Sequence, residues 1–147
     1  MDFETEIKLT IYEMIANEAV IPDTITVANK IKAPEKKVEE VFQKLAAKRL
    51  LVLEPGNPAK IRMAPPFSGI ETPFLIEINQ KSYYANCVWD AFGISAALHQ
   101  DGIIYSSDGY TKEPLILEIE DDRPIQSNYL AHFAVPAAHW WDDIIHT

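Results

Sequence analysis

The chain has 147 residues, of which 48% are hydrophobic, so it can form one globular domain or two small lobes, and its composition excludes bulk disorder. Its net charge of −9 is unevenly placed, because residues 67–147 carry three Lys or Arg against twelve acids while residues 1–66 carry ten of each. Phosphate attraction dominates nucleic-acid binding, so this acidic half argues against a nucleic-acid partner.

No apolar run approaches the roughly 18 residues that a membrane-spanning helix needs, and the N-terminal "MDFETEIKLT" is too acidic for a signal peptide. The chain holds one cysteine, Cys87, which excludes an internal disulfide and fits a reducing compartment. We therefore expect a cytoplasmic protein with no membrane partner.

Residues 1–63 have the pattern of three helices followed by a hairpin. Apolar residues recur at helical spacing in "ETEIKLTIYEMIANEAV", Thr24 is a candidate cap for a short second helix, and Pro34 suits the start of a third. Two short extended pieces then flank the turn "PGNP". This order is typical of a winged helix-turn-helix, so we predict a winged-helix-like lobe over residues 1–63.

Residues 64–73, "APPFSGIETP", are predicted to be a Pro/Gly-rich linker, followed by a small mixed or antiparallel sheet with helices over residues 74–147. A hairpin is expected around Asn79–Gln80, and a helix in "NCVWDAFGISAALHQDG" with Asn86 as its cap. Three strands are expected in "IIYSS", "EPLILEIE" and "YLAHFAVP", and a last helix in "AAHWWDDIIHT". The predicted fold class is α+β.

The candidate site is the pair Cys87 and Asp90. With Asn86 as cap, Cys87 would lie in the first helical turn, where unpaired backbone N–H groups favour a thiolate. Asp90 would lie one turn further on the same face, and its negative charge would oppose that thiolate. Such a pair can grip a soft metal through sulfur and deliver a proton from the acid. The alternative is that Cys87 is a small buried hydrophobe and Asp90 bonds to nearby backbone.

The stretch "YYANCVWDAFGISAAL", with "PFSGIETPFLIEI" before it and "HFAVPAAHWWDDIIHT" after it, resembles the alkylmercury lyase (organomercurial lyase) family. The similarity is greatest to a broader branch of uncharacterised relatives that share N-C-x-W-D-A-x-G-I. The resemblance implies that Cys87 binds mercury as a thiolate. It also implies that Asp90 is the proton donor or a second metal ligand while the carbon–mercury bond is cleaved, with no organic cofactor.

The family lyases use a second cysteine, which this pattern places just after "WWDDIIHT", where the chain ends at Thr147. A third family cysteine falls near Asp108. We therefore expect residues 74–147 to be a lyase-like core that is C-terminally truncated or shortened, and turnover to need an external small thiol. Missing strands would leave apolar surface that a homodimer could cover.

Two other functions stay open. One is a non-catalytic module that binds a thiophilic metal or small ligand through Cys87. The other is a winged-helix DNA-binding regulator that uses the lysines of the third helix, although Glu35, Glu39 and Glu40 interrupt that basic face. His139 and His146 lack the close spacing of zinc ligands, and the three tryptophans suit either packing or an apolar pocket.

Overall fold

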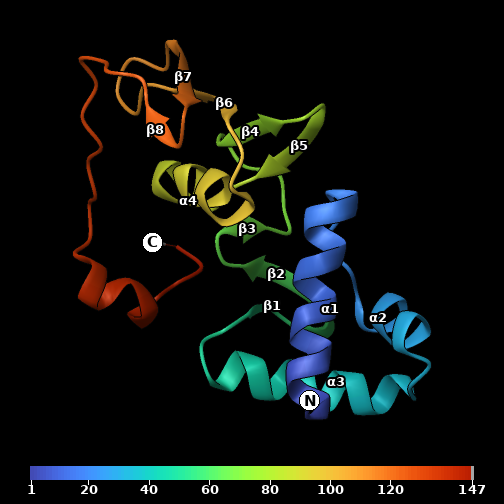
Figure 1. Ribbon diagram of the computed structural model, residues 1–147. Coiled ribbons are helices and arrows are strands. Elements are labelled where there is room, and N and C mark those ends of the chain that lie inside the picture. The colour runs from blue at the N-terminus through green and yellow to red at the C-terminus, as the bar shows by residue number, and fades with distance from the viewer. Residues whose placement is uncertain (147) are drawn as a thin grey trace.

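The computed structural model describes residues 1–146 and shows an α+β fold, which confirms the predicted class (Figure 1). Its helices are α1 (Phe3–Glu18), α2 (Thr24–Ile31), α3 (Glu35–Ala47), α4 (Val88–Leu98) and the 3₁₀ helix η1 (Ala137–Asp142). A three-stranded antiparallel sheet has the order β1-β2-β3, with β1 (Val52–Glu54), β2 (Asn57–Ala64) and β3 (Phe67–Ser68). A five-stranded antiparallel sheet has the order β5-β4-β6-β7-β8, with β4 (Leu75–Ile78), β5 (Lys81–Tyr84), β6 (Gly102–Ser107), β7 (Pro114–Glu120) and β8 (Arg123–Pro124).

Helix α1 buries the apolar stripe that its sequence predicts, namely Ile7, Ile11, Met14 and Ile15. Its first turn is capped by Asp2, whose side chain accepts a hydrogen bond from the Thr5 N–H. The stripe packs on α2 and α3, so the periodicity of the sequence decides which face of α1 joins the core.

The cap of α2 is Asp23, not Thr24 as the sequence indicated. The Asp23 carboxylate accepts from the Thr26 N–H at 2.8 Å, while Thr24 is the first helical residue and is fully buried. The Thr24 hydroxyl donates instead to Glu35 Oε1 at 2.9 Å. Its side chain therefore links α2 to α3, which leaves the capping position to the neighbouring aspartate.

Helix α3 and the β1–β2 hairpin follow as the sequence indicates. Pro34 precedes the helix, and the buried face of α3 carries Val38, Val41, Phe42 and Leu45. Gly56 has φ +75° in the tight connection between β1 and β2, a conformation that favours glycine. Three helices and a hairpin thus occur in the expected order, while the winged-helix assignment stays a prediction.

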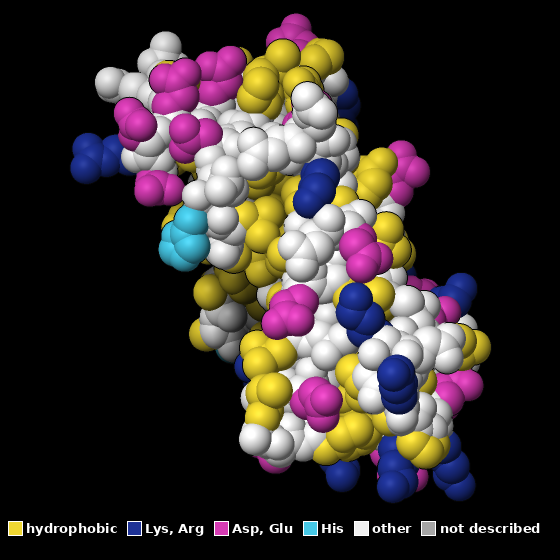
Figure 2. Space-filling model, turned by 45° about the vertical axis from the view of Figure 1, so that its right-hand side comes forward, with side chains coloured by type: hydrophobic (Ala, Val, Ile, Leu, Met, Phe, Trp, Pro, Cys, Tyr) yellow, Lys and Arg dark blue, Asp and Glu magenta, His cyan; other side chains and the backbone are white. Residues whose placement is uncertain are grey.

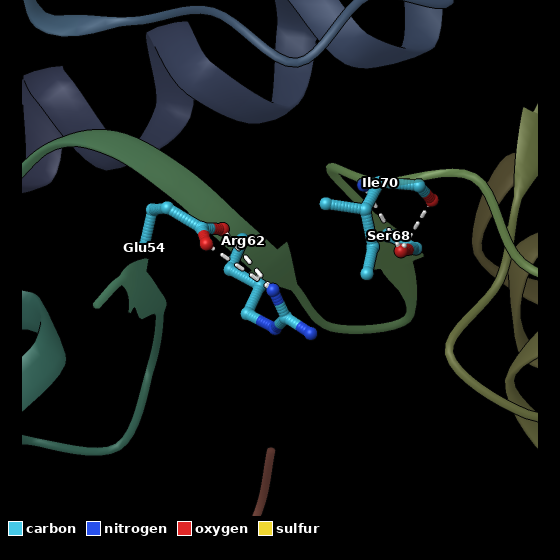
Figure 3. Close-up of polar contacts among 4 residues, drawn as sticks. All are labelled: Glu54, Arg62, Ser68 and Ile70. Atoms are coloured by element: carbon cyan, nitrogen blue, oxygen red, sulfur yellow. Dashed lines mark hydrogen bonds and ion pairs between the residues drawn. The ribbon is translucent and has the colours of Figure 1, made fainter. Parts of the chain in front are cut away.

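Residues 64–73 are partly built into the first sheet, because β3 pairs with the end of β2. The Gly69 N–H donates to Arg62 O at 2.7 Å, and a Cβ at Gly69 would lie 2.2 Å from Ile61 O, so only glycine fits there. Figure 3 shows Arg62 of β2 paired with Glu54 of β1, and the Ser68 hydroxyl turned toward Ile70. One buried cluster runs from Ile7 to Ile119, and the division at residues 63 and 73 stays a prediction.

One face of the second sheet packs against α4. Asn79 and Gln80 both have positive φ in the predicted β4–β5 hairpin, as a two-residue turn of type I′ requires. Ile76 of β4 and Ile104 of β6 are buried. Helix α4 packs on these two strands, with its own Ala91 and Ile94 buried. The helix is thereby held by one face of the sheet.

The segment "YLAHFAVP" is not a strand, which corrects the sequence prediction. The last ladder ends at Pro124, one further backbone bond runs from the Ile125 N–H to Glu118 O at 2.9 Å, and residues 125–136 contain no helix or strand. In Figure 1 this stretch runs down one side of the molecule past α4 and ends in η1. An alternating apolar pattern needs a neighbouring strand, and at this point the described residues provide none.

Figure 2 shows Lys and Arg side chains gathered at the lower end of the molecule, over the helices, and acidic side chains at the upper end near β7 and β8. Acidic side chains also lie among the basic ones at the lower end, which fits a first half with ten charges of each sign and an acidic second half. Within residues 1–146, the helices are too short or too polar to cross a membrane.

Tyr83 connects the second sheet to α1, since its hydroxyl donates to Ala16 O at 2.9 Å. We expect Tyr83→Phe to lower the free energy of unfolding by about 1 kcal/mol, the usual cost of one lost hydrogen bond. The matched control is Tyr84→Phe on the neighbouring residue, which should change it by less than about 0.5 kcal/mol. Urea unfolding measures both, and equal effects would contradict the role of this bond.

Candidate functional site

The site lies at the N-terminus of α4, where Cys87 is the capping residue. Its backbone is extended (φ −153°, ψ 177°), and its Sγ accepts a hydrogen bond from the Asp90 N–H at 3.4 Å. The sequence pointed to Asn86 as the cap, and this was wrong by one residue. The side chain of Asn86 is engaged elsewhere, so the sulfur takes the capping role.

Asp90 lies in the first turn of α4, close to Cys87, so the structure brings the two predicted site residues together. Its Oδ2 accepts from Asn86 Nδ2 at 2.9 Å. Burial raises the pKa of the Asp90 carboxyl above its ordinary value, and the hydrogen bond from Asn86 opposes that rise. The carboxyl therefore holds its proton more tightly than an exposed aspartate does.

The pKa of the Cys87 thiol is also raised. Burial is the main cause, and the negative charge of Asp90 adds to it, while the hydrogen bond from the Asp90 N–H acts in the opposite direction. Free Cys87 is thus a protonated thiol at neutral pH. A thiophilic metal that displaces this proton would gain a thiolate whose charge is already supported by a backbone donor.

An aromatic cluster lies beside the site. Trp89 is 61% exposed and makes an edge-on contact with Phe133 at 6.4 Å, and Phe133 meets Trp140 at 5.5 Å. On the same side of α4 a cavity of about 500 Å³ is lined by Trp89, Phe92, His99 and Ile119. The cluster therefore ties the C-terminal segment to the first turn of α4.

The model of the MerB alkylmercury lyase family matches residues 67–147, which is more than half of the chain. The chain belongs to the alkylmercury lyase family. Both Cys87 and Asp90 fall inside the matched residues, and so do α4 and the whole second sheet. The family resemblance inferred from the N-C-x-W-D-A-x-G-I pattern is confirmed.

A solved structure, the crystal structure of the mercury-bound form of MerB2, has a similar fold. The TM-score is 0.58 with 22% sequence identity, and the match covers 84% of this chain and 68% of MerB2. At this identity the likeness concerns the fold alone. A search of the curated proteins found no match.

Within residues 1–146, no histidine forms a metal centre with Cys87 and Asp90. His139 pairs with Asp142 and His146 with Asp143, both on the exposed C-terminal segment. Residues 1–146 contain no cluster of three His, Cys, Asp or Glu side chains that could hold a metal ion. Trp141 lies under the guanidinium of Arg49, at 5.7 Å from its ring centre, so it packs against the end of α3.

Sequence reasoning missed two residues of the site. Asn86 was treated as a helix cap, yet its four-residue spacing from Asp90 is the spacing of side chains that meet on a helix. The sequence pattern places Phe133 in a strand, and its contact with Trp89 depends on the path of residues 125–136, which an alternating pattern without a partner strand does not determine.

We expect Asp90→Asn to lower the pKa of the Cys87 thiol. The substitution removes a negative charge that disfavours the thiolate and keeps the Asp90 backbone N–H bond. Because Cys87 is the single thiol, the pH dependence of its alkylation by iodoacetamide, followed by mass spectrometry, reports its thiolate alone. Glu120→Gln, an exposed change on β7, is the control and should leave the pKa unchanged. An unchanged pKa in Asp90→Asn would refute the coupling.

Proposed function

We propose that this protein binds organomercurials through Cys87 and cleaves their carbon–mercury bond with a proton from Asp90. The observation that carries the proposal is the position of the two residues in one turn inside the family-matched part of the chain, where the Asp90 backbone N–H donates to Cys87 Sγ at 3.4 Å and the charge of the Asp90 carboxyl raises the pKa of the thiol. Family membership supports the reaction class, and the chemistry of the two side chains supports their roles.

Cys87 would take the mercury. Thiolate is the soft ligand that mercury prefers, and ligand exchange releases the thiol proton as the sulfur–mercury bond forms. The N–H donor at Sγ helps to offset the charge that the thiolate carries before the metal arrives. The substrate would then be held as an R–Hg–S adduct next to Asp90.

Asp90 would protonate the carbon. Burial raises the pKa of this carboxyl above that of an exposed aspartate, so at a given pH a larger fraction of it carries the proton that the reaction needs. The proton bonds to carbon through the electron pair of the breaking carbon–mercury bond, which gives the hydrocarbon R–H. The products at the enzyme are the Asp90 carboxylate and mercury bound to Cys87.

A second sulfur would complete the cycle. The 147 residues contain only one cysteine, so we assign this role to an external small thiol. Its thiolate adds to mercury and supports bond cleavage, and a further thiolate displaces Cys87, which releases a mercury dithiolate. Cys87 and Asp90 then regain their protons from solvent.

A second candidate function is binding without turnover. The single cysteine favours it, since one protein thiolate can grip a mercury compound without supplying the second sulfur. This alternative needs Cys87 and makes Asp90 dispensable for binding, so variants of the two residues separate it from the lyase.

The test is incubation with methylmercury or phenylmercury and excess small thiol, following hydrocarbon release and protein-bound mercury together. We expect Cys87→Ser to lose both signals. Asp90→Asn should keep bound mercury and reduce hydrocarbon release by about 100-fold or more, the usual range for loss of a general acid.

Ser95→Ala, at a buried hydroxyl of α4 that bonds Gln100 O, is a control for changes to the same helix and should retain turnover. Stoichiometric mercury binding without hydrocarbon in the wild-type protein would refute the lyase and establish the binding module. Equal hydrocarbon release in wild type and Asp90→Asn would refute the role of Asp90.

A further inference from the structure

We propose that Asn86 is a positioning residue that fixes the Asp90 carboxyl group for proton delivery. This inference rests on the proposed function, in which Asp90 is the proton donor. It concerns a residue that neither Cys87 ligation nor helix capping accounts for, since the cap of α4 is Cys87 itself.

The amide orientation of Asn86 is determined by its neighbours. Its Nδ2 lies 3.2 Å from Pro66 O, 3.4 Å from Phe67 O and 2.9 Å from Asp90 Oδ2. All three partners accept hydrogen bonds, and the two backbone carbonyls can do nothing else. The NH₂ group must therefore face them, and the amide cannot turn its oxygen toward Asp90 without breaking these bonds.

The fixed Asn86 N–H gives the two carboxyl oxygens of Asp90 different roles. Oδ2 receives the N–H of Asn86, and among residues 1–146 it is the oxygen of Asp90 that is hydrogen-bonded. The other oxygen is left to carry the transferable proton. When that proton leaves, the N–H already points at the new carboxylate, so no group has to reorient to stabilise the charge.

The arrangement has a cost that the bonds of the Asn86 NH₂ group must offset. Asn86 Oδ1 is buried and has no hydrogen-bond donor among the described residues. A buried polar atom without a partner destabilises the fold, and an apolar side chain of the same shape would avoid that loss. The N–H directed at Asp90 is the one bond of this amide that anchoring the segment before α4 to Pro66 and Phe67 does not require.

The test compares Asn86→Leu and Asn86→Ser with a matched control, Thr72→Val. Leucine has the shape of asparagine without its donor, and serine is too short to span the distance to Asp90. The control removes the bond from Thr72 Oγ1 to Ala85 O at 2.6 Å, which anchors the residue next to Asn86 without touching Asp90. The first readout is the χ1 rotamer of Asp90 from three-bond NMR couplings, and the second is hydrocarbon release relative to bound mercury.

We expect one Asp90 rotamer in the wild type and in Thr72→Val, and averaged couplings in both Asn86 variants. Hydrocarbon release should fall about 10- to 100-fold in the Asn86 variants with bound mercury unchanged. A single unchanged rotamer in a folded Asn86 variant would overturn the proposal, and so would averaging of the same size in Thr72→Val. If the wild type releases no hydrocarbon, the lyase function fails, while the rotamer still decides the role of Asn86.

Discussion

The backbone carbonyls of three consecutive residues, Pro65 to Phe67, accept hydrogen bonds that join α1 and the entry to α4 to the first sheet. The Tyr12 hydroxyl of α1 donates to Pro65 O at 3.0 Å, and Asn86, just before α4, donates to Pro66 O and Phe67 O. The buried ring of Phe67 meets those of Tyr12 and Tyr83. Helix α1, the first sheet and the entry to α4 are therefore fixed to one short piece of backbone, which is why the first turn of α4 has a defined position relative to both sheets.

In the first turn of α4, burial and hydrogen bonding shift the pKa of each site residue in opposite directions. Burial raises the pKa of both Cys87 and Asp90, and each also accepts a hydrogen bond that favours its charged form. Burial thus favours the protonated form of each group relative to an exposed side chain, and each anion has a donor in place when it forms. A thiol that loses its proton to a metal and an acid that loses its proton to carbon need the same thing from the protein. That need is a donor that is already oriented before the charge appears.

The features of the fold that local sequence patterns determine could be predicted from the sequence. The buried stripe of α1, the α3 face and the Asn79–Gln80 hairpin follow from periodicity and turn chemistry, and Cys87 with Asp90 follows from a specific motif. The sequence failed where a residue had two possible partners. Thr24 and Asn86 are both good caps in isolation, and each is instead used by a contact distant in sequence, with Glu35 and with Pro66. The path of residues 125–136 could not be predicted for a related reason. An alternating pattern forms a strand only where a neighbouring strand can pair with it.

The short strand β8, which contains Pro124, affects how copies of the molecule can meet. Strand β8 forms the outer edge of the second sheet, and it is only two residues long, with Pro124 as one of them and Asp121 and Asp122 directly before it. An edge this short, with a missing donor and two adjacent negative charges, is a poor template for a strand from another chain. Where β8 covers Ile119 and Glu120 of β7, the sheet therefore resists pairing with a strand from another chain.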